Sequence, residues 1–140
     1  MTEQLPTDHY RERRNFFNER AEKWLDLCYR DPESGEHTRC DAEFERLFSL
    51  VKLPEDGRIL DVGCGSGVLV PYILRRLAAN GRLMEIDYAE NMIAVNRRLH
   101  TDKRISFGVA DIMNMDITPA SIDVVLCFAC FPHFENKPES

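Results

Sequence analysis

The sequence predicts an α/β fold: a doubly wound, mostly parallel sheet with helices on both faces, preceded by N-terminal helices. Two observations carry this prediction. From residue 58 onward, short apolar runs typical of buried strands alternate with segments of helical periodicity. A glycine-rich segment, Asp61–Gly67, lies between the first apolar run and the helical segment that follows it. Such alternation is typical of right-handed parallel crossovers in one sheet.

Composition indicates a globular domain and limits the kinds of partner that it is expected to bind. The chain has 140 residues, of which 44% are hydrophobic and 30% charged, and its net charge is −6. This acidic balance argues against a nucleic-acid partner bound through phosphate neutralisation. No apolar run approaches the ~20 residues of a membrane span, and the N-terminus has no apolar signal segment. We therefore expect no membrane span and a cytoplasmic location.

Two amphipathic helices are expected before the sheet. The first covers residues 10–29, where apolar side chains share one face of a 3.6-residue period: Phe17, Ala21, Trp24, Leu25 and Cys28. Turn residues at 31–35 end this helix, and a second is expected over residues 37–51. We expect residues 1–56 to form a helical lead-in and lid, and residues 57–140 a cofactor-binding half; together they make one domain.

The sheet region is expected to alternate strands with helices. Strands are predicted over residues 59–62, 83–86, 105–109 and 122–128, the last being the most hydrophobic. Helices are predicted over residues 68–79 and 90–100. Pro71 falls in the first turn of the earlier helix, where a missing N–H is tolerated.

The segment between the first strand and its helix is a candidate ligand loop. Its glycines, Gly63, Gly65 and Gly67, permit a tight turn and let a ligand approach bare backbone. The helix N-terminus behind them offers free N–H groups, at the sheet edge where doubly wound proteins bind ligands. The spacing is G-x-G-x-G, and Val68 stands where a dinucleotide fingerprint needs its last small residue. A nucleotide-dependent oxidoreductase is therefore the weaker alternative.

Five segments together resemble one known family. Ile59–Gly67 closely resembles the first motif of the class I S-adenosylmethionine-dependent methyltransferases. Met84–Asp87 is similar to the second motif of that family, Val109–Asp111 to the third, and Ile122–Leu126 to its fourth strand. Phe16–Trp24 resembles the leading helix of the small-molecule branch, which includes quinone-type methyltransferases. The resemblance implies a Rossmann-like fold, S-adenosyl-L-methionine as cofactor with S-adenosyl-L-homocysteine as product, and a small-molecule methyl acceptor.

The resemblance assigns cofactor roles to the glycine loop. Gly63 and Gly65 would present backbone to the methionine part of the cofactor, with Cys64 and Gly67 completing the loop. Asp61 would orient the loop and help to hold the cofactor's ammonium group, since an acid at a buried strand end needs a partner. A plain strand-to-helix turn is the alternative reading of the loop.

Further cofactor contacts are expected after the second and third strands. Asp87 would accept hydrogen bonds from the vicinal ribose hydroxyls; the alternative is an acid that complements the next helix dipole. Asp111 would accept a bond from the adenine amino group, or else cap a loop, and Ile112 would offer its backbone N–H to the ring. Tyr88 and Met92 would flank ribose and adenine, with core packing as the alternative.

A catalytic base and a metal site were weighed separately. His133 follows the fourth strand, where an imidazole could accept a proton from the methyl acceptor, or else line the pocket. Cys127 and Cys130 would point to opposite faces of a strand, so no metal site is predicted. The odd total of five cysteines indicates reduced thiols.

The length of the chain raises one further expectation. The resembling family has strand order 3-2-1-4-5-7-6, and this chain supplies strands 3-2-1-4 alone, so we expect a fragment without the second half of the fold. Its fourth strand would be an exposed apolar edge through which the chain self-associates. A cofactor-binding module or inactive remnant that transfers no methyl group is therefore a second functional reading.

Overall fold

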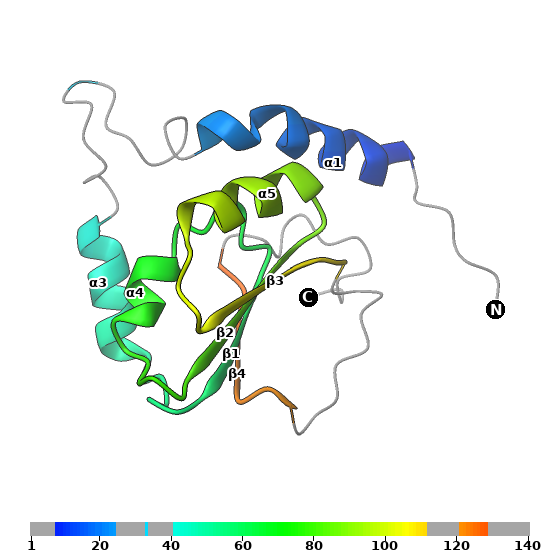
Figure 1. Cartoon of the computed structure of the whole chain (residues 1–140). Helices are drawn as coiled ribbons and strands as arrows, with labels where there is room; N and C mark the ends of the chain where they lie inside the picture. Colours follow the sequence, from blue (N-terminus) through cyan, green and yellow to red (C-terminus); the bar gives the residue numbers. More distant parts are fainter. Residues whose placement is uncertain (1–7, 25–32, 34–40, 112–120, 129–140) are drawn as a thin grey trace, which may run out of the picture.

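The computed structural model describes residues 8–24, 33, 41–111 and 121–128 (Figure 1). Its centre is a four-stranded sheet of order β3-β2-β1-β4, in which every neighbouring pair is parallel. The strands are β1 (Arg58–Val62), β2 (Arg82–Asp87), β3 (Ile105–Val109) and β4 (Val124–Leu126). The predicted strand order 3-2-1-4 and the parallel α/β class are confirmed.

The register of the strands decides which side chains share a face. Ile59 pairs with Leu83, and Asp61 pairs with Glu85 two residues further along. Because side chains alternate along a strand, Ile59 and Asp61 point to one face of the sheet, together with their partners on β2. Leu60 points to the opposite face, where it clusters with other apolar residues.

Three helices cover one face of the sheet. Helix α4 (Val70–Leu74) and helix α3 (Asp41–Leu50) pack on Ile59 and Leu83, in a core cluster that includes Phe44, Phe48, Tyr72 and Ile73. Helix α5 (Glu90–Leu99) contacts β2 and β3 on that face, where its Asn96 donates a hydrogen bond to Glu85. Both helices predicted after the first strand therefore lie on one face, and within the described residues no helix covers the other.

Helix α4 is shorter than the predicted helix over residues 68–79. After Leu74 the chain continues in turns, in which Arg76 N–H donates to Ile73 and Leu77 N–H donates to Leu74. The carbonyl groups of Leu74 and Leu77 accept hydrogen bonds from Arg104, 2.9 and 2.6 Å away. A distant side chain therefore terminates this helix, which local periodicity does not reveal.

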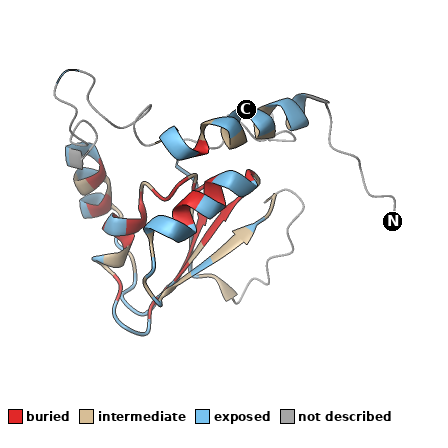
Figure 2. Cartoon of the chain, turned by 45° about the horizontal axis from the view of Figure 1, so that its top comes forward, coloured by how far each residue is buried: buried red, intermediate tan, exposed pale blue. Residues whose placement is uncertain are grey.

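The N-terminal helix crosses the outside of α5 (Figure 1). Helix α1 (Asp8–Arg20) continues into a 3-10 turn, η1 (Ala21–Lys23), and the remainder of the predicted helix over 10–29 lies outside the described residues. Ala21, Phe17 and Trp24 pack on the α5 side chains Met92 and Val95. Figure 2 shows the contrast between the buried core of α5 and the mainly exposed α1.

Strand β4 lies at one edge of the sheet and, within the described residues, pairs with β1 alone. It spans three residues rather than the predicted 122–128. Asp123 fixes its start, because the Asp123 carboxylate accepts a bond from Arg58 N–H (2.7 Å) while Asp123 N–H donates to Arg58 (2.9 Å). Val125 is 54% exposed, so the strand presents apolar surface at this edge.

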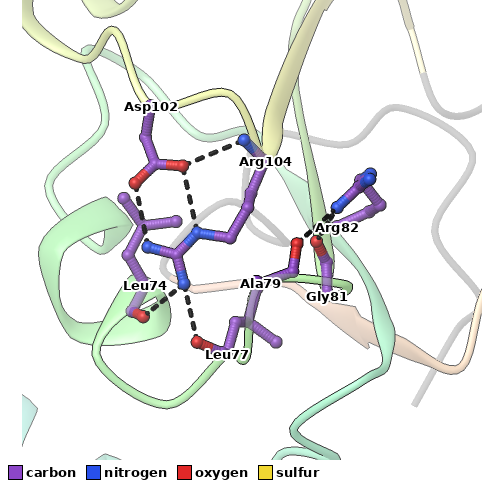
Figure 3. A network of polar contacts seen from close by, with 7 residues as sticks. All are labelled: Leu74, Leu77, Ala79, Gly81, Arg82, Asp102 and Arg104. Carbon is purple, nitrogen blue, oxygen red and sulfur yellow. Dashed lines mark hydrogen bonds and ion pairs between the residues drawn. The ribbon is translucent and has the colours of Figure 1, made fainter.

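Near the amino ends of the strands, the Arg104 guanidinium connects the segment before β3 to the end of α4 and the turn that follows it (Figure 3). Besides the carbonyl groups of Leu74 and Leu77, it binds both carboxylate oxygens of Asp102 at 3.0 and 2.9 Å. These bonds hold the pKa of Asp102 at about 2, below its usual value. In the part of the chain that the structure describes, no helix combines the length and apolarity needed to cross a bilayer.

Candidate functional site

The glycine loop at the carboxyl end of β1 has a backbone that only glycine adopts readily. Gly63, Gly65 and Gly67 have φ angles of 65°, 58° and 91°, all in the left-handed region. Space is the second constraint at Gly67, where an added Cβ would lie 2.4 Å from Asn96 Oδ1 and 2.8 Å from His100 Cε1. The loop therefore needs its glycines for both conformation and fit.

Asp87 anchors this loop from the end of the neighbouring strand. Its Oδ2 accepts a hydrogen bond from Gly65 N–H at 2.9 Å, and its Oδ1 accepts one from Ala89 N–H at 2.8 Å. Burial raises the pKa of Asp87, and the backbone N–H groups of Ala89, Gly65 and Tyr88 oppose that rise. Each carboxylate oxygen keeps a second acceptor position, so the carboxylate can also receive hydroxyl groups.

Two further acids face each other beneath the loop. Asp61 and Glu85 are register partners on β1 and β2, and both are buried. Burial is the main cause of the raised pKa of each group, about 6 for Asp61 and well above the usual value for Glu85. The sequence analysis singled out Asp61 and missed Glu85. The signal it overlooked is that Glu85 shares strand parity with Leu83 and Asp87, both of which face the helices.

A polar chain connects this acid pair to the end of α5. Asn96 donates to Glu85 Oε1 at 3.2 Å and to Cys64 Sγ at 3.5 Å. Its own Oδ1 lies 2.9 Å from His100 Nδ1, which therefore carries the proton of that bond. Burial, followed by the charges of Glu85 and Asp61, raises the pKa of Cys64 well above its usual value. The Cys64 thiol is neutral and serves as a loop element.

Unsatisfied polar atoms gather at this edge of the sheet. Four buried side-chain atoms in the described ranges lack a hydrogen-bond partner: Asp61 Oδ2, Ser66 Oγ, Glu85 Oε2 and Tyr88 OH. All four lie in the last residues of β1 and β2 or in the turns that follow them. Since buried polar groups are normally paired, this concentration indicates a surface built to receive polar groups of a ligand.

Aromatic side chains from the N-terminal helix cover the same edge. Trp24 Nε1 lies 3.5 Å from the position of a Cβ on Gly65, and the Trp24 ring meets Phe17 edge-to-face at 5.3 Å. Tyr88 contacts Tyr10 at 5.2 Å and Phe17 at 6.1 Å between ring centroids. Burial raises the pKa of Tyr88 to about 12, so its hydroxyl is a neutral donor at physiological pH.

The structure describes the remaining predicted site residues only in part. Met92 is buried in the cluster beneath α1 and η1, which agrees with its core-packing alternative, and its Sδ is 3.9 Å from the Gly65 Cβ position. Asp111 lies just beyond β3 at the same edge. Ile112 and His133, like Cys130, fall outside the described residues. Among those described, no three acids, histidines or cysteines form a group that could hold a metal ion.

The comparison with protein families places this arrangement in a known class. A family model described as a methyltransferase domain matches residues 59–139, which is more than half of the chain. The chain therefore belongs to the methyltransferase domain family.

Individual relatives agree with this class. The chain is 29% identical to the ubiquinone biosynthesis O-methyltransferase of Hydrogenovibrio crunogenus, over 85% of this chain and 48% of that protein. It is 32% identical to the malonyl-[acyl-carrier protein] O-methyltransferase of Bacillus cereus, over 56% of this chain and 29% of that one. The chain thus spans about half or less of these two curated relatives.

A solved structure supports the fold independently. The SAM-dependent methyltransferase from Aquifex aeolicus superposes with a TM-score of 0.65, covering 83% of this chain and 58% of that chain at 19% identity. At that identity the likeness establishes the fold, which is the class I methyltransferase fold with its Rossmann-like parallel sheet.

Proposed function

We propose that this chain binds S-adenosyl-L-methionine at the carboxyl edge of its sheet, as the cofactor half of an enzyme that methylates a small molecule. The single observation that supports this best is the gathering of unpartnered buried polar atoms around a glycine loop of left-handed conformation. A merely structural turn has no need of such atoms. The methyltransferase domain match makes this cofactor the natural ligand for them.

The residues present fit the polar groups of that cofactor. Asp87 would receive the ribose hydroxyls while it holds Gly65, and Asp61 would face the ammonium group. The loop backbone from Gly63 to Gly67 would lie along the methionine part. Asp111 and Ile112 would receive the adenine, with Tyr88 beside the ribose.

The expected role of the chain in catalysis is binding and orientation. S-adenosyl-L-methionine supplies a sulfonium-bound methyl group for an SN2-type transfer to a nucleophile. The loop and Asp87 would fix the donor so that this methyl group faces the acceptor side. A neutral Cys64 thiol does not compete as a nucleophile. We propose His133 as the group that accepts a proton when the acceptor must lose one.

A small acceptor suits the aromatic cover over the loop. Residues 1–56 would form the lid and residues 57–140 the cofactor half, in a cytoplasmic protein. The relatives named for ubiquinone biosynthesis and for malonyl-[acyl-carrier protein] support a small or carrier-bound acceptor. Exposed Val125 at the β4 edge supports self-association through that strand.

Calorimetric titration with S-adenosyl-L-homocysteine tests the proposal. We expect saturable binding by the 140-residue chain, weakened on the order of 100-fold by Asp87→Ala, because two hydrogen bonds to a charged group are lost. Asp56→Ala, in the exposed turn before β1, is the matched control and should bind as the unmodified chain does. A folded chain that shows no saturable binding would contradict the proposal.

A turnover assay separates the enzyme from a binding module. Methyl transfer to any member of a panel of phenolic and carboxylic acceptors supports the enzyme. Binding without turnover across the panel supports the module or remnant instead. Titration with NAD is expected to show no binding.

A further inference from the structure

Glu85 is the buried acid that the proposed cofactor contacts leave without a role. It has no exposed surface, and it lies in the middle of β2 with its side chain on the face that α5 covers. No ion pair joins Glu85 to a cation within the described residues, where the ion pairs involve other acids. A buried acid of this kind is costly to ionise, so its presence calls for an explanation.

The arrangement of the pair indicates a proton. Glu85 and Asp61 are register partners, both are buried, and Glu85 Oε2 and Asp61 Oδ2 have no hydrogen-bond partner. Two neighbouring buried carboxylates repel each other, so one of them keeps its proton. Asn96 already donates to Glu85 Oε1, which leaves Oε2 as the position for a proton directed to Asp61.

The surroundings favour retention of this single proton. Asp87, on the same strand face, adds negative charge, while Cys64 in the loop is a neutral thiol. His100 approaches through Asn96, and burial lowers its pKa, so it is neutral at neutral pH. The strands on either side contribute apolar register partners: Phe107 on β3 opposite Glu85, and Leu126 on β4 opposite Asp61. The described groups around the pair therefore provide no positive charge.

We propose that Glu85 is a positioning residue of the cofactor site: it holds Asp61 by a shared proton, and binding of the cofactor's ammonium group releases that proton. This inference rests on the proposed function. In the step, the O–H bond of Glu85 breaks and the proton passes to the buffer. The pair changes from one negative charge to two, and the ammonium group supplies the compensating positive charge. Glu85 thereby makes cofactor affinity depend on pH.

Linkage fixes the direction of this dependence. Because the bound state carries fewer protons than the free state, raising the pH strengthens binding, by up to about tenfold per pH unit where one proton is released. The dependence ends at a pH where the free protein has already lost the shared proton. A carboxamide at position 85 cannot release a proton, so Glu85→Gln should remove the dependence while keeping the shape and the bond from Asn96.

Two measurements test this inference. First, S-adenosyl-L-homocysteine is titrated at one pH in two buffers of different ionisation enthalpy, which counts the protons released. We expect close to one proton for the unmodified chain and close to none for Glu85→Gln, which should still bind. Equal counts for the two proteins, or a count of zero in the unmodified chain, would overturn the inference even though binding upheld the proposed function.

The second measurement needs no ligand. An infrared spectrum of the free 140-residue chain at neutral pH should contain the carbonyl band of a protonated carboxyl group, and Glu85→Gln should lack it. Absence of the band from the unmodified chain overturns the shared proton directly. Failure of the proposed function looks different, because the band would be present while S-adenosyl-L-homocysteine failed to bind. A chain in which Asp56→Ala replaces the exposed acid is the control, and it should keep the band.

Discussion

At the amino ends of the strands, one guanidinium donates four hydrogen bonds from its side chain and connects α4 to the segment before β3. At the carboxyl ends, buried polar atoms of four side chains are left without a partner in the described ranges. The two edges belong to the same sheet. The comparison separates a region whose polar groups are paired within the fold from one with unpartnered polar atoms, to which we propose that a ligand binds.

The pKa values of acids at the two edges are shifted in opposite directions. Arg104 lowers the pKa of Asp102 to about 2, whereas burial among other acids raises the pKa of Asp61 to about 6. The difference lies in the surroundings of each carboxyl group: Arg104 stabilises the charged form of Asp102, whereas burial disfavours the charged form of Asp61. Raised values at a sheet edge with a glycine loop are typical of functional sites.

The largest effect is expected from Gly67→Ala, which should disrupt the carboxyl edge alone. The new methyl group would overlap Asn96 and His100 and would force alanine into a left-handed conformation. We expect the free energy of unfolding to fall by about 3 kcal/mol, measured by urea denaturation. Gly108→Ala is the control, because its Cβ would meet Ile86 at an ordinary 3.6 Å. Equal losses for the two variants would contradict the account of the loop.

Arg104→Met should damage the amino edge without affecting cofactor binding. It keeps the apolar stem but removes the side-chain donor to the carbonyl groups of Leu74 and Leu77, of which Leu74 retains the Leu77 N–H; this should cost about 1–2 kcal/mol of unfolding free energy. Affinity for S-adenosyl-L-homocysteine should stay unchanged in calorimetry. Arg82→Met provides the comparison, since Arg82 binds only the nearby carbonyl groups of Ala79 and Gly81 and should matter less. A large fall in affinity for Arg104→Met would remove the distinction between the edges.

The acids of the two edges should contribute to stability in different pH ranges. A carboxyl group with a lowered pKa stabilises the fold above its unfolded value, so the Asp102 contribution should disappear as pH falls from about 4 to about 2. A raised pKa acts in reverse: the contribution of Asp61 is complete below about 4 and is lost as pH rises through about 6. Glu85 also loses its contribution on the alkaline side, because burial raises its pKa well above the usual value. Melting temperatures should show a flatter acid limb in Asp102→Asn and a flatter neutral limb in Glu85→Gln. The same flattening in both windows for either variant would contradict this assignment.

The smallest effect is expected at the lid. Trp24 is the only tryptophan of the chain and lies against Gly65. Its fluorescence should therefore change on titration with S-adenosyl-L-homocysteine. Trp24→Phe should lower affinity by about threefold, since it removes part of the aromatic cover and the indole N–H. An unchanged emission spectrum at saturation would argue that the lid does not meet the ligand.

Much of this comparison could be predicted from the sequence, because its signals are local. Alternating apolar runs predicted the strands, the family resemblance implied their order, and three glycines predicted a tight turn that a ligand can approach. The sequence did not reveal Glu85 as a buried site residue, because an acid between apolar neighbours is typical of a strand with one exposed face. Only the packing of Asn96 from α5 shows that this face is covered. Helix α4 was predicted too long for a similar reason, since Arg104 binds its last residue from 30 positions away along the chain.

The fit of Gly67 against α5 also determines how this sequence can vary. The side chains of Asn96 and His100 fill the space beside Gly67 and contact each other. A change at any of these three positions therefore alters which residues fit at the other two. Their substitutions should be strongly non-additive: a smaller residue at 96 or 100 would recover part of the stability that Gly67→Ala loses. In a set of related sequences, these three positions should therefore change together, although they stand 29 and 4 residues apart along the chain.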